Sequence, residues 1–244
     1  MRILVTRPEA DCEDMRRALT AAGHSVVISP LVTILSEPIP DIRADDIAAL
    51  VITSQNALRA LAGNPQLEHL TSVKTFVVGP RTFAMARELG FRHIIEGPGT
   101  GAELAELLKD HGLPADGRIV HLAGNKLAFN FAQAFSELGY RAETIRCYRS
   151  EPATGFTAEA EEAIRQGQVD LVTLLSPQTA NTFVRLIKST GLEVEARSLS
   201  YACISEATCK FLVDEGWSCT HVAAKPNNQE VLALVNRIAA QFQQ

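Results

Sequence analysis

The sequence predicts an α/β protein built from two parallel-sheet units. Short apolar runs alternate with helical patterns along the whole chain, and several of the helical patterns end at a glycine. The second half of the chain also repeats the order of elements found in the first half. Strands that alternate with helices are typical of parallel sheets made of right-handed βαβ units.

The expected strands are four to seven residues long and rich in Val, Ile and Leu, and they span 3–7, 25–29, 50–53, 75–79, 93–96, 118–123, 142–148, 170–175, 199–204 and 220–224. The helical patterns between them lie at about 9–22, 54–62, 81–90, 101–111, 127–139, 157–167, 178–190, 206–216 and 228–241. Glycines at the ends of five helices suit the left-handed position that closes a helix, and they are Gly23, Gly90, Gly112, Gly139 and Gly216.

The repeat relates residues 2–27 to 118–143, and the run "LVITSQNAL" at 50–58 to "VTLLSPQTA" at 172–180. Residues 77–91 match 203–217 in the same way. Each repeat is a βαβ piece, an extended segment, and then a βαβαβ piece.

The two extended segments, 30–42 and 146–156, contain proline and are poor in helix formers. Two arrangements are open: each repeat forms its own domain, or the halves are exchanged. We favour exchange, because both extended segments then occupy equivalent positions and can pair as a two-stranded hinge. The expected domains are 1–35 with 155–244, and 45–145, joined by linkers at 36–44 and 146–154.

Composition excludes several classes of protein. The chain has 244 residues, of which 46% are hydrophobic and 21% charged, and its net charge is −5, an ordinary globular composition without a basic stripe. We therefore expect no nucleic-acid partner, no membrane span and no signal peptide, and a cytoplasmic monomer. Five cysteines without CxxC spacing, and six histidines without HxxxH pairing, predict neither a disulfide frame nor a metal site.

The usual catalytic motifs are also absent. The sequence has no GxSxG and no GxxxxGK[ST]. "GPGTG" at 97–101 follows a strand, but it lacks the lysine and the third-glycine spacing, so we interpret it as a βα turn with a helix starting at Thr100–Ala102.

The strand-to-helix corners remain, and these gather at the carboxyl edge of a parallel sheet, where ligands bind. They are small, polar or basic. Helix capping alone explains the Ser, Thr and Asn residues, since each cap stabilises its helix by about 1 kcal/mol. It does not explain the bases Arg7, Arg81, Lys126 and Lys225, which are unfavourable at the positive end of a helix unless an anion is bound there. The corners therefore predict anion-binding edges, one from each domain, facing each other across a cleft.

The chain resembles the uroporphyrinogen-III synthase family over essentially its whole length. The resemblance rests on the order of weak motifs: "ILVTRP" (3–8) with Pro30-Leu31, "TSQNA" (53–57), "VGPRT" (78–82), "ELGY" (137–140), "YRSEP" (148–152), "SPQTANTF" (176–183), "CISEAT" (203–208) and "AKPNNQEVLALV" (224–235). One departure is Ser205, where the family usually has glycine, so the geometry of that corner is less certain than that of Gly79.

The resemblance implies two flavodoxin-like α/β domains in the exchanged arrangement, and a lyase without metal or organic cofactor. Its substrate is hydroxymethylbilane, a linear tetrapyrrole with an acetate and a propionate on each pyrrole. The product is uroporphyrinogen III, formed with loss of water and inversion of the last ring in the cleft between the domains. The residues expected to bind this polyanion are Thr6, Arg7, Thr53, Ser54, Asn56, Gly79, Arg81, Thr82, Ser176, Gln178, Thr179, Ser205 and Thr208.

Tyr148 matches the linker tyrosine of the family and is the candidate proton donor to the leaving hydroxyl; the alternative is a half-buried linker tyrosine with a solvated hydroxyl. Folding the substrate into one reactive conformation is the larger expected contribution. Two other functions remain open. One is a non-catalytic two-domain clamp for a small anion. The other is a nucleotide-sugar or dinucleotide enzyme, for which the glycine fingerprint is missing.

Overall fold

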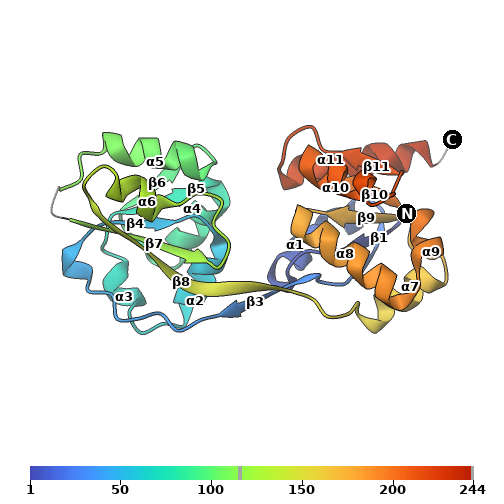
Figure 1. Cartoon of the computed structure of the whole chain (residues 1–244), viewed down its shortest axis with the longest axis horizontal. Helices are drawn as coiled ribbons and strands as arrows, with labels where there is room; N and C mark the ends of the chain where they lie inside the picture. Colours follow the sequence, from blue (N-terminus) through green and yellow to red (C-terminus); the bar gives the residue numbers. More distant parts are fainter. Residues whose placement is uncertain (115–116, 243–244) are drawn as a thin grey trace. The chain divides into compact units, whose positions relative to one another are not determined.

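The computed structural model describes residues 1–114 and 117–242, which form two compact units. Unit 1 consists of Met1–Thr33 and Glu151–Gln244, and unit 2 of Ile34–Ser150 (Figure 1). Each unit has one sheet covered by helices on both faces. The predicted α/β class with parallel sheets is thus confirmed. The expected domains 45–145 and 155–244 include residues 115–116 and 243–244, which lie outside the described residues.

The sheet of unit 1 has the strand order β11-β10-β9-β1-β2, and every pairing in it is parallel. Its strands are β1 (Arg2–Val5), β2 (Ser25–Ile28), β9 (Leu171–Leu174), β10 (Ser200–Cys203) and β11 (Thr220–Val222). Strand β1 pairs with β2 on one side and with β9, from the second half of the chain, on the other.

Two apolar layers hold this sheet. Alternate residues of β1 point to opposite faces, so Ile3 and Val5 pack with helices α1 (Glu9–Ala21) and α11 (Asn228–Gln241). Leu4 packs on the other face with α7 (Ala158–Arg165), α8 (Pro177–Thr190), α9 (Glu193–Arg197) and α10 (Glu206–Asp214). Strands buried on both faces explain the continuous apolar runs in the sequence.

The sheet of unit 2 has the order β3-β8-β7-β4-β5-β6. Its strands are β3 (Val32–Ser36), β4 (Ile47–Ile52), β5 (Thr75–Val78), β6 (Ile94–Gly97), β7 (Arg118–Gly124) and β8 (Arg141–Pro152), with a 3₁₀ turn at Ala44–Asp46 before β4. Helices α2 (Gln55–Ala62), α3 (Leu67–Leu70) and α4 (Gly79–Glu88) pack on one face. Helices α5 (Gly101–Asp110) and α6 (Phe131–Ser136) pack on the other.

The extended segments pair with each other, as the sequence predicts. Strand β8 continues to Pro152 and lies beside β3, and the Glu37 N–H donates to the Cys147 carbonyl at 2.9 Å. The ion pair of Arg146 with Glu37 joins the same two segments.

Helix ends follow local chemistry, with one error in the prediction. The five helix-ending glycines all have positive φ, between 55° and 90°. The predicted helix 127–139 is wrong at both ends: α6 begins at Phe131, because the Asn130 side chain caps it by accepting from the Gln133 N–H at 3.2 Å. Residues 125–130 therefore form a loop at the end of β7, which matters for the site below.

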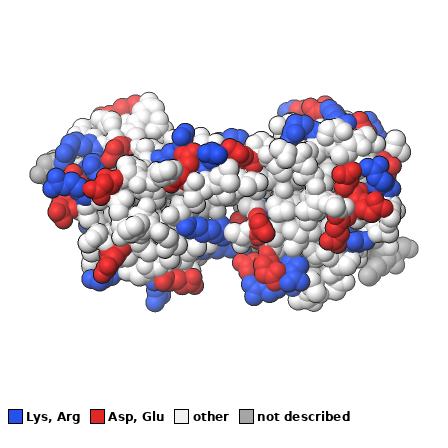
Figure 2. Space-filling model, turned by 90° about the horizontal axis from the view of Figure 1, so that it is seen from below, with Lys and Arg blue, Asp and Glu red and all other residues white. Residues whose placement is uncertain are grey.

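Charges are mixed on the face seen in Figure 2, where basic and acidic side chains lie interspersed among uncharged areas. Several ion pairs join exposed side chains one helical turn apart, such as Lys210 with Asp214. Pairs of this kind contribute little to stability.

Candidate functional site

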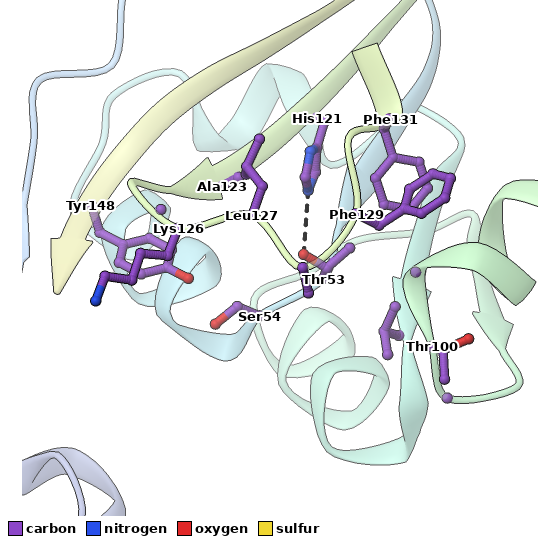
Figure 3. A pocket seen from close by; sticks show the side chains of 15 residues that line it. Thr53, Ser54, Thr100, His121, Ala123, Lys126, Leu127, Phe129, Phe131 and Tyr148 are labelled. Atoms are coloured by element: carbon purple, nitrogen blue, oxygen red, sulfur yellow. Dashed lines mark hydrogen bonds between the residues drawn. The ribbon is translucent and has the colours of Figure 1, made fainter. Parts of the chain in front are cut away.

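A pocket of about 420 Å³ lies in unit 2 at the carboxyl ends of strands β4 and β7 (Figure 3). Thr53 and Ser54 follow β4, and the loop at 125–130 with Lys126 and Phe129 follows β7. The remaining lining residues come from β5, the start of α5, β7, α6 and β8, and include Gly99, Thr100, Gly101, His121, Gly124, Phe131 and Tyr148. Pockets at this edge of a parallel sheet are the usual ligand sites of α/β folds.

The polar end of the pocket is organised around Ser54 and Tyr148. Ser54 caps α2, and its hydroxyl accepts from the Asn56 N–H at 3.2 Å. The half-buried Tyr148 ring lines the pocket, and its hydroxyl points toward the Ser54 side chain (Figure 3). Burial raises the pKa of Tyr148 above its usual 10.0, and the neighbouring Ser54 side chain and Gly124 backbone partly offset that rise. The phenol is therefore protonated throughout the neutral range.

The apolar end is formed by aromatic rings. Phe129 and Phe131 meet edge to face at 4.8 Å between centroids, and the His121 ring lies 4.8 Å from Phe131. His121 is only 2% exposed, and its Nε2 is 3.2 Å from the Thr53 hydroxyl, whereas Nδ1 has no partner among the described residues. Burial lowers the pKa of His121 from 6.5 to about 4, so the ring is neutral near pH 7.

The sequence predicts Thr53, Ser54, Lys126 and Tyr148 as corner and linker residues, and the pocket brings these four together. It missed His121 and the two phenylalanines. His121 lies within a predicted strand, and no spacing rule singles it out. Phe129 was also missed, because the sequence predicts a helix from residue 127, whereas Phe129 lies in the loop before α6.

The start of α5 closes another side of the pocket. Thr100 and Glu103 form a capping box, in which the Glu103 carboxylate accepts from the Thr100 N–H at 3.0 Å and from its hydroxyl at 2.7 Å. The predicted turn at "GPGTG" followed by a helix is therefore confirmed. A carboxylate of the protein already occupies this helix terminus.

Among the described helices of eight or more residues, α2, α4 and α8 have no acidic residue in the first turn. Helices α1, α5, α7, α10 and α11 each carry at least one. An external anion at the starts of α1, α5, α7, α10 and α11 meets a like charge, whereas no acidic side chain in the first turn offsets the helix dipole of α2, α4 and α8. The predicted corners therefore fall into two classes: helix starts without an acidic residue (acid-free) and helix starts with one.

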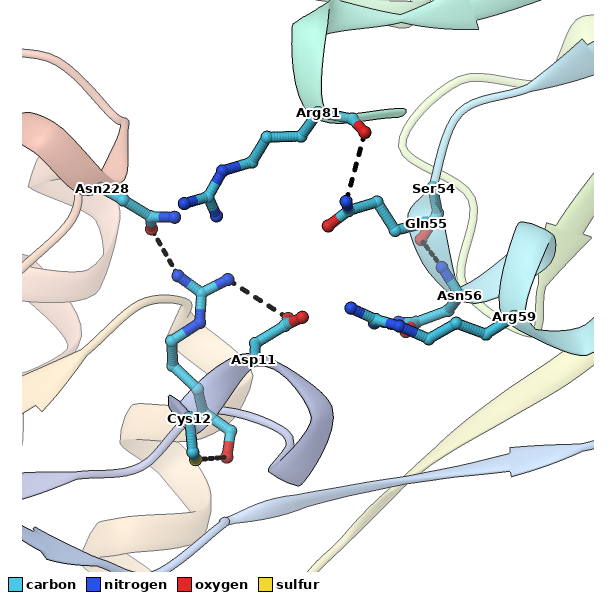
Figure 4. A network of polar contacts seen from close by, with 9 residues as sticks. Asp11, Cys12, Ser54, Gln55, Asn56, Arg59, Arg81 and Asn228 are labelled. Carbon is cyan, nitrogen blue, oxygen red and sulfur yellow. Dashed lines mark hydrogen bonds and ion pairs between the residues drawn. The ribbon is translucent and has the colours of Figure 1, made fainter. Parts of the chain in front are cut away.

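Most predicted residues of unit 2 lie on helix starts of the acid-free class. Asn56 is in the first turn of α2, where its side-chain oxygen accepts from Arg59 at 2.6 Å. Gly79 begins α4 with φ of 71°, a conformation that favours glycine. The Arg81 side chain is exposed, and its carbonyl accepts from the Gln55 amide at 3.2 Å (Figure 4). Thr82 is buried.

In unit 1 the acid-free helix start is that of α8. The Ser176 hydroxyl accepts from the Thr179 N–H at 3.1 Å and lies 2.8 Å from the Thr179 hydroxyl. Gln178 is half-buried, and its amide nitrogen has no partner among the described residues. Ser205 and Thr208 repeat this cap on α10, beside Glu206. Ser205 has an extended backbone with φ of −150°, so its corner differs in conformation from that of Gly79.

The polar side chains of the first corner, Thr6 and Arg7, have their partners within unit 1. The Thr6 hydroxyl is buried and donates to the Thr173 carbonyl at 2.6 Å, between strands β1 and β9. The Arg7 guanidinium pairs with Asp11 at 3.2 Å and donates to Asn228 (Figure 4). A carboxylate within unit 1 thus accounts for the base at this helix start.

No helix in the described part of the chain is long and apolar enough to cross a membrane. Within residues 1–114 and 117–242, no group of three or more His, Cys, Asp or Glu side chains is arranged to hold a metal ion. His121 meets an aromatic ring and a hydroxyl rather than further ligands.

Two parallel-sheet units, with polar corners at their carboxyl edges and a half-aromatic pocket in unit 2, define the chain as a two-unit α/β protein. The family model for uroporphyrinogen-III synthase HemD matches residues 13–233, and the chain belongs to this family. A comparison with curated protein sequences found no match.

Solved structures of similar fold carry the same family name. The chain is similar to uroporphyrinogen-III synthetase from Helicobacter pylori, with 17% identity, a TM-score of 0.67, and coverage of 98% of this chain and 100% of that one. It is also similar to a mutant uroporphyrinogen III synthase from Thermus thermophilus, with 19% identity, a TM-score of 0.57, and coverage of 100% of this chain and 99% of that one. At these identities the likeness shows the fold.

Proposed function

We propose that the protein is a lyase that cyclises hydroxymethylbilane to uroporphyrinogen III, with loss of water and inversion of the last pyrrole ring. The single observation that carries this proposal is the family match over residues 13–233. The pocket in unit 2 supports it, because its two ends suit the two parts of such a substrate: aromatic rings for a pyrrole, and hydroxyl and ammonium groups for its carboxylates.

We propose that the substrate carboxylates dock on the helix starts without acidic residues. These are the N-termini of α2, α4 and α8, and they carry the predicted residues Thr53, Ser54, Asn56, Gly79, Arg81, Thr82, Ser176, Gln178 and Thr179. Backbone N–H groups supply much of the binding there, so removal of any one side chain leaves most of the site intact. Arg7, Ser205 and Thr208 lie at helix starts with their own acidic residues and have a smaller part in this scheme.

Tyr148 is the proposed proton donor. Loss of the terminal hydroxyl gives an azafulvene, which the substituted carbon of the last ring attacks; the resulting spiro intermediate fragments and recloses with the ring inverted. The departing oxygen leaves as water only if it gains a proton, and the phenol is the protonated group beside Ser54 at the polar end of the pocket. General acid catalysis of this kind contributes about 10²–10⁴-fold.

The alternative function, a non-catalytic clamp for a small anion, needs the same helix starts but no chemistry. We further propose that the two units are the folding domains of the enzyme, with the segment 45–145 inserted between 1–35 and 155–244, and that it acts in the cytoplasm as a monomer.

The test is to incubate the purified protein with enzymatically generated hydroxymethylbilane and to separate the product isomers after oxidation. We expect the type III isomer, at a rate that EDTA does not change. Product that consists only of the uninverted isomer, as in the reaction without enzyme, contradicts the proposal.

A further inference from the structure

Strand β8 contains one extra residue beside the pocket. Along β7 and β8 the partners advance one by one from Arg118 with Arg141 to Ala123 with Arg146, and then Gly124 pairs with Tyr148. Cys147 is thus the additional residue of a β-bulge. Bulges occur next to functional sites, where they turn a side chain that regular alternation would point elsewhere.

The bulge changes the face on which Tyr148 lies. Ile145 and Cys147 are two residues apart and pack into the same apolar cluster, on the face of the sheet that α2 covers. Regular alternation would place Tyr148 on the opposite face. Instead, Tyr148 packs against this same cluster, and its hydroxyl points toward Ser54, the cap of α2, in the pocket (Figure 3).

Gly124 provides the space for the ring. A Cβ atom at position 124 would lie 2.5 Å from Cε2, 2.6 Å from Cζ and 3.0 Å from the hydroxyl oxygen of Tyr148. Gly124 is not among the glycines with positive φ, so its backbone conformation does not itself call for glycine. All three of these nearest atoms belong to Tyr148, so the contact with this ring is what a side chain would disturb.

We propose that Gly124 is a positioning residue for the reaction: with the β8 bulge, its missing side chain lets the Tyr148 ring lie against β7 and keeps the Tyr148 hydroxyl beside Ser54 in the pocket. Any residue larger than glycine at this position pushes the phenol away from Ser54. This inference rests on the proposed role of Tyr148, and it adds a second determinant of that role, which acts through Tyr148.

The test compares Gly124→Ala with Gly63→Ala. Gly63 lies in the same unit at the end of α2, with φ of −100° and no atom within 4 Å of an added Cβ. We expect Gly124→Ala to lower kcat at least about tenfold, the lower side of the general-acid range, with little change in KM. Gly63→Ala should keep the wild-type kcat.

NMR of the Tyr148 ring tests its contact with residue 124 separately from the effect of that contact on kcat. The chain has three tyrosines, so ring signals of ¹³C-tyrosine can be assigned with Tyr148→Phe, and buried Tyr201 serves as an internal reference. Gly124→Ala should shift the Tyr148 signal and leave that of Tyr201 unchanged. If kcat and the Tyr148 signal both stay as in the wild type, the positioning role is overturned.

Two further outcomes are informative. If the ring signal moves but neither Gly124→Ala nor Tyr148→Phe changes kcat, the contact exists but the proposed chemistry of Tyr148 fails. If Gly124→Ala unfolds the protein, Tyr148→Ala in the same chain should restore folding by removing the clash; failure to restore it overturns the inference. In a Tyr148→Ala background, adding Gly124→Ala should change kcat less than about twofold.

Discussion

Unfolding of wild type and His121→Gln between pH 7 and pH 4.5 tests the buried histidine of the pocket. The folded-state pKa of His121 is about 4 and its usual value is 6.5, so the unfolded chain binds a proton in this interval while the folded chain does not. Protonation of the unfolded state lowers the free energy of unfolding as the pH falls from 6.5 towards 4. The loss reaches its full extent below the folded-state pKa.

The magnitude follows from the two pKa values. One pKa unit corresponds to about 1.4 kcal/mol, and linkage over the interval from pH 7 to pH 4.5 gives a loss of about 2 kcal/mol from this residue. The ring is 2% exposed, so solvent screening reduces the effect little. Glutamine keeps a hydrogen-bonding group near Thr53 and does not titrate.

The assay is urea unfolding followed by far-UV circular dichroism at pH 7 and pH 4.5. The pH-dependent loss of stability should be about 2 kcal/mol smaller in His121→Gln than in the wild type. His93→Gln is the control for removal of a histidine, because that ring is exposed to solvent in the folded protein. An equal pH dependence in His121→Gln and wild type would refute the argument that burial keeps His121 neutral.

Three other predictions concern the helix starts and the proton donor. Asn56→Asp adds a carboxylate to the acid-free start of α2 and should raise KM roughly tenfold through like-charge repulsion. The control is Asn228→Asp, at the start of α11, which already has Glu230; it should change KM less than about twofold. Equal effects of the two substitutions would contradict the division of helix starts into two classes. Tyr148→Phe should lower kcat at least about tenfold with an unchanged isomer ratio and melting temperature, and a wild-type rate would return Tyr148 to a structural role. Thr100→Ala removes the cap of α5 and should cost about 1 kcal/mol in urea unfolding; an unchanged midpoint would mean that the cap contributes nothing.

The sequence predicted the sheets and most helices because their signals are local. Runs such as 171–174 are buried on both faces, and Ser54, Ser176 and Ser205 lie where helices begin. Capping chemistry and apolar periodicity act within a few residues, so they can be recognised without the fold.

Features that depend on contacts between elements were not predictable in the same way. The pairing of Gly124 with Tyr148 requires the register of two strands, and a bulge of one residue leaves no signal in either strand alone. The neutral state of His121 follows from rings and strands packed around it. Arg7 looked like an anion-binding base, since its partners Asp11 and Asn228 are identified only by the structure.

The most direct test of the account is hydrogen–deuterium exchange of the protein with and without saturating uroporphyrinogen III under anaerobic conditions. The central claim is that substrate carboxylates dock on helix starts that lack acidic residues. It predicts slower amide exchange at the starts of α2, α4 and α8, around residues 54–57, 80–83 and 177–180, and unchanged exchange at the starts of α1 and α11. Unchanged exchange at α2 and α8, with protection at α1 or α11 instead, would contradict it.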